Sequence, residues 1–335
     1  MRHAILTAAF CLLAFIVAAA EPPATRPARV AFAAQGSEFP FDTDLFRGVL
    51  RAKGKSLGLT PVVENLSQTA IAGPYGIFSC YRMLDAGNRY GPAAWDWASQ
   101  ARLLDDGAVE VRWTNDADHP FDLLAVYRWS AANTLDLTLT VSPRKDLKNY
   151  ELFLASYLPP CNVALVYATP AGQNSTFMPA EKADGDWQMF PRDDKAVAII
   201  QDGRWKRPPN PVDWTIRPRL ATPIAIRRDA KSGLTAVILA HPEDCFAIAT
   251  PFGEEGHRSL YLSLFGRDLA ASTPATARAR LILGRDISND QALRDYRDFV
   301  AAASAQAGMT ALPGTSSKQQ TVIPSRHGLW PARMQ

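Results

Sequence analysis

The sequence has almost no excess of charge of either sign. Lysine and arginine total 36 against 33 aspartate and glutamate residues, so the formal net charge of the 335-residue chain is +3 at pH 7. Nucleic acids and anionic membrane surfaces attract proteins through clusters of unbalanced positive charge. The composition therefore gives no electrostatic basis for a nucleic-acid partner.

Long hydrophobic runs are also missing after residue 20. No later segment approaches the roughly 20 apolar residues that a membrane-spanning helix needs, so no membrane span is predicted. Residues 1–20 combine Arg2 and His3 with an apolar run from Ala4 to Val17 and the small residues Ala18–Ala20. This pattern is typical of a signal peptide cleaved after Ala20, and it predicts a secreted or periplasmic protein.

Cysteines and catalytic signatures are scarce. Beyond the signal peptide only Cys80, Cys161 and Cys245 remain. They lie too far apart in sequence for a zinc motif, and whether two of them form a disulfide stays open. The chain has no Gly-x-Ser-x-Gly elbow, and the turn Pro251–Gly253 lacks the glycines and lysine of a phosphate loop. The sequence predicts no metal site and no cofactor.

Short segments with alternating apolar residues are abundant. Apolar residues take every second position in residues 109–113, 121–129 and 135–141, and the residues between them are polar except Leu124 and Val126. This period of two is typical of antiparallel strands that bury one face and leave the other in water. Shorter apolar segments follow, and Ser288 with Gln291 forms the capping pattern of one closing helix. The pattern predicts an all-β fold with two large packed antiparallel sheets and one C-terminal helix.

Composition divides the rest of the chain. Residues 21–58 are expected to be an N-terminal lead-in, with a short helix around Asp44–Lys53. Residues 59–305 are expected to form the β domain, and residues 306–335 a disordered tail.

Two long loops are expected inside the domain, at residues 169–195 and 202–218, because both stretches are rich in proline and polar residues. The second is basic and aromatic. It suits either a carboxylated sugar held by arginine or a solvated connection in which arginine stacks on tryptophan. Its relevant residues are Trp205, Arg207, Trp214, Arg217 and Arg219.

One stretch differs from both a core strand and an ordinary loop. Residues Gly73–Trp97 hold six aromatic residues interleaved with arginine, aspartate and asparagine. Aromatic rings offer flat apolar faces to the C–H surfaces of a sugar ring, and planar polar side chains suit its hydroxyl groups. The stretch therefore indicates a carbohydrate-binding surface. The alternative is a strand pair with core aromatics and solvated charges.

The same stretch carries a resemblance to a known family. Its runs Tyr81–Leu84, Arg89–Gly91 and Trp95–Trp97, together with the following strands and Asn149–Leu154, resemble secreted bacterial proteins of the galactose mutarotase-like superfamily. The resemblance rests on strand pattern and composition, and it implies a β-supersandwich with a carbohydrate ligand. Aldose epimerases of that superfamily carry an Asn-His-x-Tyr-x-Asn type motif. That motif is absent here, so no catalytic residue is assigned by position.

These observations predict an exported carbohydrate-binding protein whose site lies on the concave face of one sheet. The expected partner is a mono- or oligosaccharide. For an acid and a base that could open a sugar ring, the candidates are His257 and Glu151, with an ordinary loop histidine as the alternative. The candidate ligand-binding residues are Arg82, Arg89, Tyr90, Trp95, Asp96, Trp97 and Tyr157.

Two other functions stay open. One is a carbohydrate-active enzyme, either an aldose epimerase or a polysaccharide lyase that uses tyrosine or histidine as a base and arginine to neutralise a uronate. The other is a structural envelope protein without a small-molecule site. Convergence of Arg82, Trp95, Trp97 and His257 on one open cleft would favour an enzyme. Exposure of the aromatics and arginines without His257 would favour a binding module.

Overall fold

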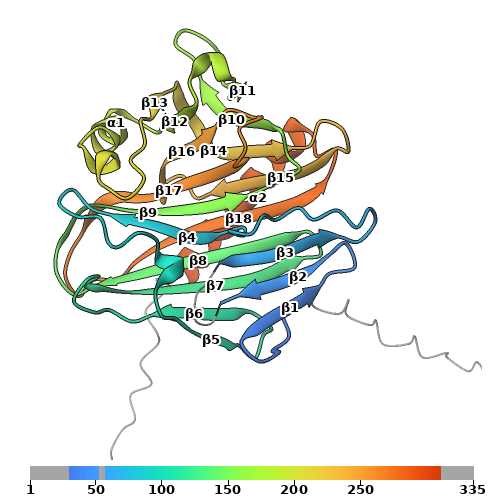
Figure 1. Ribbon diagram of the computed structural model, residues 1–335, viewed down its shortest axis with the longest axis horizontal. Helices are drawn as coiled ribbons and strands as arrows, with labels where there is room; N and C mark the ends of the chain where they lie inside the picture. The colour runs from blue at the N-terminus through green and yellow to red at the C-terminus, as the bar shows by residue number, and fades with distance from the viewer. Residues whose placement is uncertain (1–29, 53–56, 311–335) are drawn as a thin grey trace, which may run out of the picture.

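The alternating segments form strands whose apolar faces meet between two large antiparallel sheets (Figure 1). The computed structural model describes residues 30–52 and 57–310. The predicted signal peptide at 1–20 lies outside these residues, as does most of the predicted tail at 306–335. Within them, the prediction of an all-β sandwich with a C-terminal helix is confirmed.

The larger sheet has nine strands. In spatial order these are β11 (Thr176–Pro179), β10 (Val163–Thr169), β14 (Arg219–Arg228), β15 (Leu234–Ala240), β18 (Ala275–Arg285), β8 (Thr134–Pro143), β7 (Phe121–Ala131), β6 (Val109–Trp113) and β5 (Gln100–Leu103). Every second residue of β7 and β8 is buried, as the alternating pattern predicts. The polar residues between them lie on the outer face of this sheet.

The second sheet has six strands. In spatial order these are β13 (Thr215–Ile216), β12 (Trp187–Pro191), β16 (Cys245–Pro251), β17 (Ser259–Leu269), β9 (Leu147–Tyr157) and β4 (Ser79–Leu84). All neighbours are antiparallel except β12 and β13. Every residue of β16 is buried, and so are the last eight of β9, so both faces of this sheet are covered.

A third, three-stranded sheet lies beside the sandwich. It consists of β1 (Glu38–Asp42), β2 (Phe46–Arg51) and β3 (Gly58–Glu64). These strands occupy much of the expected lead-in, and their phenylalanines belong to the main core.

The helix predicted around Asp44–Lys53 is wrong, because this segment contains strand β2. Phe46 and Leu50 are both buried, and a spacing of four residues suits a helix face and a strand face equally. Gly48, which lies between them, favours the strand over the helix. A Cβ at Gly48 would lie 2.1 Å from the carbonyl oxygen of Pro61, so β2 approaches its neighbour as only glycine allows.

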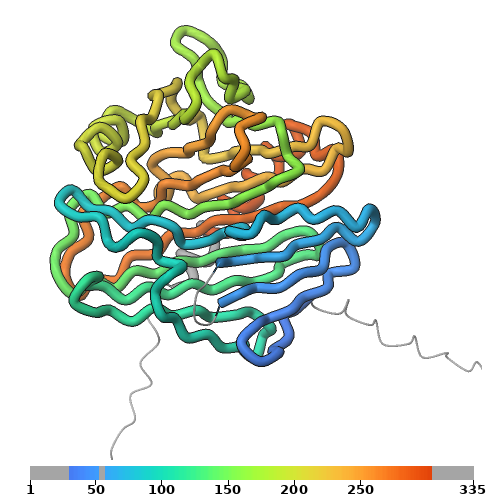
Figure 2. Tube along the Cα trace, in the orientation of Figure 1, coloured from blue at the N-terminus to red at the C-terminus, as the bar shows by residue number. Residues whose placement is uncertain are grey.

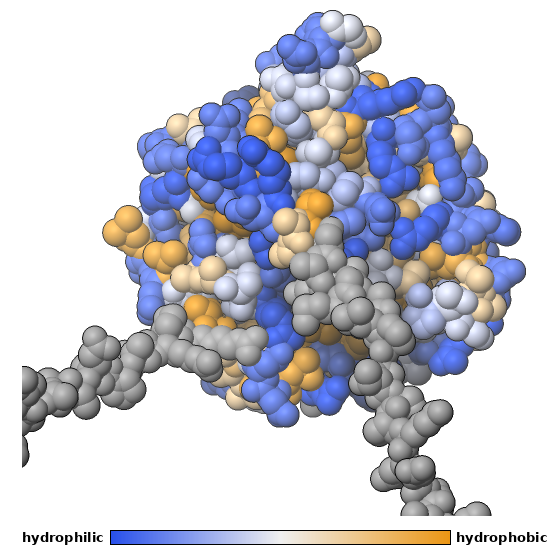
Figure 3. All heavy atoms as spheres, turned by 180° about the vertical axis from the view of Figure 1, so that it is seen from behind, coloured by the Kyte–Doolittle hydropathy of each residue, from blue (hydrophilic) through white to orange (hydrophobic). Residues whose placement is uncertain are grey.

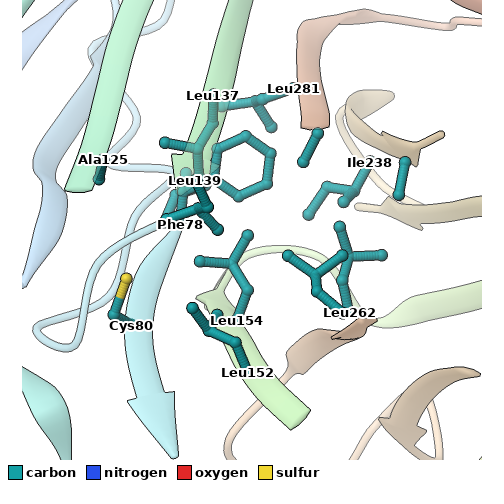
Figure 4. Packing of buried hydrophobic residues seen from close by; sticks show 14 of the residues in the cluster. Phe78, Cys80, Ala125, Leu137, Leu139, Leu152, Leu154, Ile238, Leu262 and Leu281 are labelled. Atoms are coloured by element: carbon teal, nitrogen blue, oxygen red, sulfur yellow. The ribbon is translucent and has the colours of Figure 1, made fainter. Parts of the chain in front are cut away.

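The main core fills the space between the two large sheets (Figure 4). Leu137 and Leu139 of β8 and Leu152 and Leu154 of β9 belong to it, and none is more than 1% exposed. Burial of each such side chain stabilises the fold by about 1.5–3 kcal/mol. The sandwich therefore supplies a rigid support for whatever lies on its outer faces.

The cysteines also belong to buried regions. Cys80, Cys161 and Cys245 are free thiols, so no disulfide forms among them. Burial raises the pKa of each thiol to about 12. They are therefore unreactive thiols at neutral pH.

Helix α2 (Asn289–Thr310) covers part of the outer face of the nine-stranded sheet. The predicted cap is present, since the Gln291 backbone amide donates to Ser288 Oγ at 3.1 Å. The helix extends past residue 305, where the prediction ended the domain. No helix in residues 30–52 or 57–310 has the length and apolarity that crossing a membrane requires. Seen from behind, the surface is mostly hydrophilic with scattered hydrophobic residues (Figure 3).

The two segments predicted as long loops contain ordered elements, so that prediction is wrong. The first holds β11, the 3₁₀ turn η2 (Lys182–Asp184), β12 and the start of helix α1 (Asp194–Ile200), and the second holds η3 (Arg204–Lys206) and β13. Strand β12 exists because it pairs with β16, some 60 residues away in sequence, which local sequence does not reveal.

Candidate functional site

The outer face of the six-stranded sheet carries a second apolar layer. Along β9, Leu152 and Leu154 belong to the main core, whereas Phe153, Ala155 and Tyr157 belong to a separate outer cluster. Successive side chains of a strand point to opposite faces. Both faces of β9 are therefore packed, and the outer one is rich in aromatic rings.

A β-bulge in β4 places two consecutive side chains on this outer face. The register with β9 shifts between Cys80, which lies opposite Leu154, and Arg82, which lies opposite Phe153. The extra residue is Tyr81. Because a bulge interrupts the alternation, Tyr81 and Arg82 both lie on the outer side while Cys80 stays in the main core.

A cavity of about 820 Å³ lies on this face, beneath the loops that follow β4 and α1. Its aromatic lining residues are Tyr75, Tyr81, Trp95, Phe153, Tyr157, Trp187, Trp205, Trp214 and Tyr261. Its polar and charged lining residues are Arg82, Asp96, Asp186, Asn210, Asp213 and His257. Cavities of this size, with aromatic walls and few polar groups, are typical of small-molecule sites.

Stacked rings form one wall of the cavity. The rings of Tyr81 and Trp95 are parallel, with 4.4 Å between their centres. Tyr75 stacks on the same indole at 5.6 Å. Trp95 lies in the 3₁₀ turn η1 (Ala94–Asp96), which contacts β4. The stack thus joins a strand and two loops into one aromatic surface.

Arg82 lines the cavity without a carboxylate partner. It is 4% exposed, and its guanidinium carbon lies 4.7 Å from the centre of the Tyr81 ring and 5.2 Å from that of Trp205. Its side chain donates one hydrogen bond, from Nη2 to the Tyr81 hydroxyl at 3.0 Å, and Nε is buried without a partner. Among the described residues no carboxylate forms an ion pair with it.

Two further arginines join the loops that cover the cavity. Arg89 donates to the carbonyl oxygens of Arg207, at 3.2 Å, and of Pro209. Arg207 donates in return to the carbonyl oxygens of Asp85, at 3.3 Å, and Ala86, at 2.6 Å. These bonds hold the loop after β4 beside the loop after α1 (Figure 2).

Two phenols form part of the cavity floor. Tyr157 is 6% exposed and Tyr261 is 4% exposed, and their rings pack edge-on with 6.1 Å between ring centres. Burial raises the pKa of Tyr261 to about 12 and holds the pKa of Tyr157 far above its ordinary value. Both are therefore neutral hydrogen-bonding groups at physiological pH.

His257 lies at the open side of the cavity. Its Nδ1 is 2.8 Å from Oε1 of Glu255, and its side chain is 56% exposed. The ring of Trp187 lies beside it, with 5.7 Å between ring centres. A histidine oriented by a carboxylate through Nδ1 keeps Nε2 for a ligand.

Glu151 does not join His257, which corrects the predicted acid–base pair. The carboxylate is fully buried and accepts from Arg204 Nη1 at 3.2 Å and from Ser263 Oγ at 2.8 Å. Burial raises the pKa of Glu151. It precedes Tyr157 by six residues on β9, which separates the two by about 20 Å. Glu151 is part of a buried ion pair and does not line the cavity.

The structure brings together some of the predicted site residues and separates others. Those that line the cavity are Arg82, Trp95, Asp96, Tyr157 and His257. Those that do not are Arg89, Tyr90, Trp97 and Glu151. Of the four residues whose convergence would favour an enzyme, three meet here and Trp97 does not.

Tyr90 and Trp97 lie on the other side of the chain segment that carries Trp95. The Tyr90 hydroxyl donates to the Asp85 carboxylate, and its ring packs edge-on against Phe121 in the main core. Trp97 packs at a tilt against His119, with 3.9 Å between ring centres, and lines a neighbouring cavity. Trp95 lies within η1 and Trp97 ends it, and this turn directs the two indoles to different sides.

Sequence reasoning did not assign Tyr75, Phe153, Trp187 or Tyr261 to the site. Tyr75 was within the aromatic stretch and could have been included. The other three lie on β9, β12 and β17, and only the pairing of these strands brings them to the cavity. Within residues 30–52 and 57–310, no three histidine, cysteine, aspartate or glutamate side chains come close enough to hold a metal ion.

A scan against protein-family models and a search of curated proteins find no match to this chain. Solved structures do match. A galactose 1-epimerase from Lactobacillus acidophilus is 9% identical with a TM-score of 0.42, over 76% of this chain and 98% of that one. An α-N-acetylgalactosaminidase from Bifidobacterium bifidum is 10% identical with a TM-score of 0.46, over 81% of this chain and 39% of that one.

A heparan sulfate lyase from Pedobacter heparinus also matches, at 6% identity and a TM-score of 0.42, over 76% of this chain and 36% of that one. An epimerase is thus among the solved structures to which the chain is similar. The likeness concerns the β-sandwich fold alone. At these identities and TM-scores it carries nothing about substrate or activity.

Proposed function

We propose that this protein binds a carbohydrate in the aromatic cavity. The single observation that supports this most is the wall formed by Tyr75, Trp95 and Tyr81, which lies beside a buried arginine and two neutral phenols. Flat apolar surface next to fixed donors and acceptors suits the mixed C–H and hydroxyl surface of a sugar.

The test uses two tryptophans from the same turn. Trp95→Ala removes a cavity wall, whereas Trp97→Ala removes an indole that lies outside the cavity and serves as the matched control. A thermal-shift screen against neutral and acidic oligosaccharides should raise the melting temperature of the wild type and of Trp97→Ala, because a ligand that binds only the folded state stabilises it. Trp95→Ala should lose this shift. Equal shifts in both variants, or none in the wild type, would contradict the proposal.

A carbohydrate-active enzyme is the second candidate, and the contact between His257 and Glu255 favours it. An exposed imidazole oriented by a carboxylate can exchange a proton with a bound sugar. The raised pKa values of Tyr157 and Tyr261 argue against either phenol as the base. If a sugar that binds is also turned over, His257→Gln should abolish turnover and leave binding within about twofold. Unchanged turnover in this variant would exclude His257 as the acid or base.

Export is also part of the proposal, and the pattern of residues 1–20 supports it. Protein recovered from the periplasm or medium should begin at Glu21. Retention of Met1 on cell-associated protein would contradict export.

A further inference from the structure

The charge of Arg82 is not neutralised by any other side chain described. Its side chain is buried, its one hydrogen bond goes to the Tyr81 hydroxyl, and its Nε has no partner. Asp85, the carboxylate nearest in sequence, is occupied by the backbone amides of Gly87 and Asn88 and by the Tyr90 hydroxyl. A buried charge without a counter-ion is costly to a fold, so such groups are normally paired.

The surroundings of Arg82 add positive charge. Arg89 and Arg207 are bound to carbonyl oxygens and not to carboxylates. Burial lowers the pKa of Arg89 to about 10, and repulsion by Arg82 adds to the shift. Carbonyl dipoles satisfy the N–H groups of these arginines but leave their net charge in place. Arg82 at the cavity wall and Arg89 and Arg207 in the loops over it therefore form no ion pair with the described carboxylates.

The carboxylates that line the cavity do not neutralise the positive charge of Arg82. Asp96, Asp186 and Asp213 are all exposed, and Asp213 is paired with Lys206. Charges in water are screened over distances of about 10 Å, whereas a buried guanidinium is screened far less. The cavity is therefore positive at its buried end and acidic only at its rim.

The aromatic rings at Arg82 suit a buried cation that has no counter-ion in the protein. Tyr81 and Trp205 lie within cation–π distance on the apolar sides of the guanidinium group. This contact helps to retain the cation in the folded protein without consuming its hydrogen-bond donors. Nη1 forms no hydrogen bond with the described residues, so it can donate to a ligand.

We propose that the cavity is selective for acidic saccharides, and that Arg82 binds the anionic group of the sugar, a carboxylate or a sulfate. This rests on the proposed carbohydrate-binding function and narrows it to one chemical class. Charge-assisted hydrogen bonds from arginine to an oxyanion are among the strongest polar contacts, and they gain strength where water is excluded. Asp186 at the rim would repel acidic groups that remain outside the cavity.

The test compares acidic sugars with their uncharged derivatives by isothermal titration calorimetry. The probes are oligosaccharides of galacturonate, glucuronate and mannuronate, the methyl ester of each, neutral galacto- and gluco-oligosaccharides, and a sulfated galacto-oligosaccharide. The proteins are the wild type, Arg82→Met, Arg82→Lys and Arg112→Met. Arg112 is an exposed arginine outside this cavity, so its variant controls for the change in net charge.

The wild type and Arg112→Met should bind at least one uronate or sulfated sugar about tenfold or more tightly than its uncharged counterpart, the gain expected of a charge-assisted contact. Arg82→Met should remove this difference, and Arg82→Lys should keep part of it. Preference for uronate or for sulfate identifies which anion is bound. Binding of neutral sugars or esters as tight as binding of acidic ones would overturn the proposal and leave the carbohydrate function standing. Binding of no sugar of any kind would overturn both.

The melting temperature of the unliganded variants separates binding from structure. Since the charge of Arg82 is unpaired, Arg82→Met should melt no lower than the wild type. A large fall in melting temperature would show that Arg82 is retained for stability, which would contradict its assignment to a ligand.

Discussion

The outer faces of the two large sheets use arginine in different ways. On the nine-stranded sheet, Arg280 of β18 donates to both oxygens of Asp136 on β8, at 2.6 and 3.0 Å, and its guanidinium lies over Phe299. On the six-stranded sheet, Arg82 also lies over aromatic rings but has no carboxylate. Both cations have cation–π contacts, so the counter-ion is the difference. Arg280 has its counter-ion within the protein, whereas Arg82 has none among the described side chains.

A second arginine beside the six-stranded sheet makes the comparison sharper. Arg204 of η3 is fully buried and Arg82 nearly so, but Arg204 is paired with Glu151 of β9 and with Asp202. It immediately precedes Trp205, which contacts Arg82. On this face, Arg204 is therefore neutralised by carboxylates of the protein, whereas Arg82 is available to bind a ligand.

The largest effect is expected from removal of Glu151. Glu151→Ala leaves a fully buried arginine with only the partly exposed Asp202, and loss of one partner of a buried pair costs about 3–5 kcal/mol. Asp136→Ala is the matched change on the other face, where both partners are partly exposed, and it should cost at most about 1 kcal/mol. Urea unfolding of both variants measures the difference. Similar losses of unfolding free energy in the two variants would contradict this difference between the two faces.

A smaller effect is expected at an ion pair of intermediate burial. Glu64 of β3 accepts from Arg285 of β18 at 2.7 and 2.6 Å, and this pair joins the three-stranded sheet to the nine-stranded one. Glu64→Gln should lower the free energy of unfolding by about 1.5–3 kcal/mol at pH 7, as for a hydrogen bond to a charged group. The hydrogen bonds from Arg285 hold the pKa of Glu64 below its ordinary value of 4.5.

The sign of the pH dependence follows from that shift. A carboxyl group whose pKa is lower in the folded state stabilises the fold above the pKa of the unfolded chain and loses this contribution as the pH falls through the folded value. Wild type and Glu64→Gln should therefore differ at neutral pH, and the difference should shrink as the pH falls below 4.5 and through the lowered pKa of the folded state. A difference that persists unchanged into acid would show that the charge of Glu64 is not what stabilises the contact.

The same contrast explains how far the sequence predicts this molecule. Strands β7 and β8 can be predicted from the sequence because one face of each is buried in the main core and the other faces water. This one-sided burial produces apolar residues at every second position. Strand β12 cannot be predicted from the local sequence, because both faces of its sheet are covered. Its residues Trp187–Pro191 then lack the alternation, and their burial depends on β16.

The site is partly predictable for a similar reason. The aromatic stretch leads to Arg82 and Trp95, because unusual composition marks a surface that is neither core nor ordinary loop. Composition does not show to which side of the backbone each of these side chains points. The bulge in β4 puts Tyr81 and Arg82 on the same face, and the η1 turn decides that Trp95 faces the cavity and Trp97 does not. These are properties of strand register and backbone geometry.

The smallest effect is expected from the buried phenols of the cavity. The pKa of Tyr261 is raised to about 12 from an ordinary value of 10, so the neutral phenol favours the fold below pH 10 and this contribution is lost as the pH rises toward 12. Tyr261→Phe should therefore leave the phenolate absorbance of the folded protein unchanged up to about pH 11, whereas the unfolded chains should differ by one phenol that titrates near pH 10. If instead the folded wild type shows a phenolate near neutral pH that Tyr261→Phe removes, the cavity holds an ionised tyrosine beside an unpaired arginine. That pair is the arrangement by which a lyase abstracts a proton next to a neutralised uronate, and it would turn the acidic-sugar site from a binding site into a catalytic one.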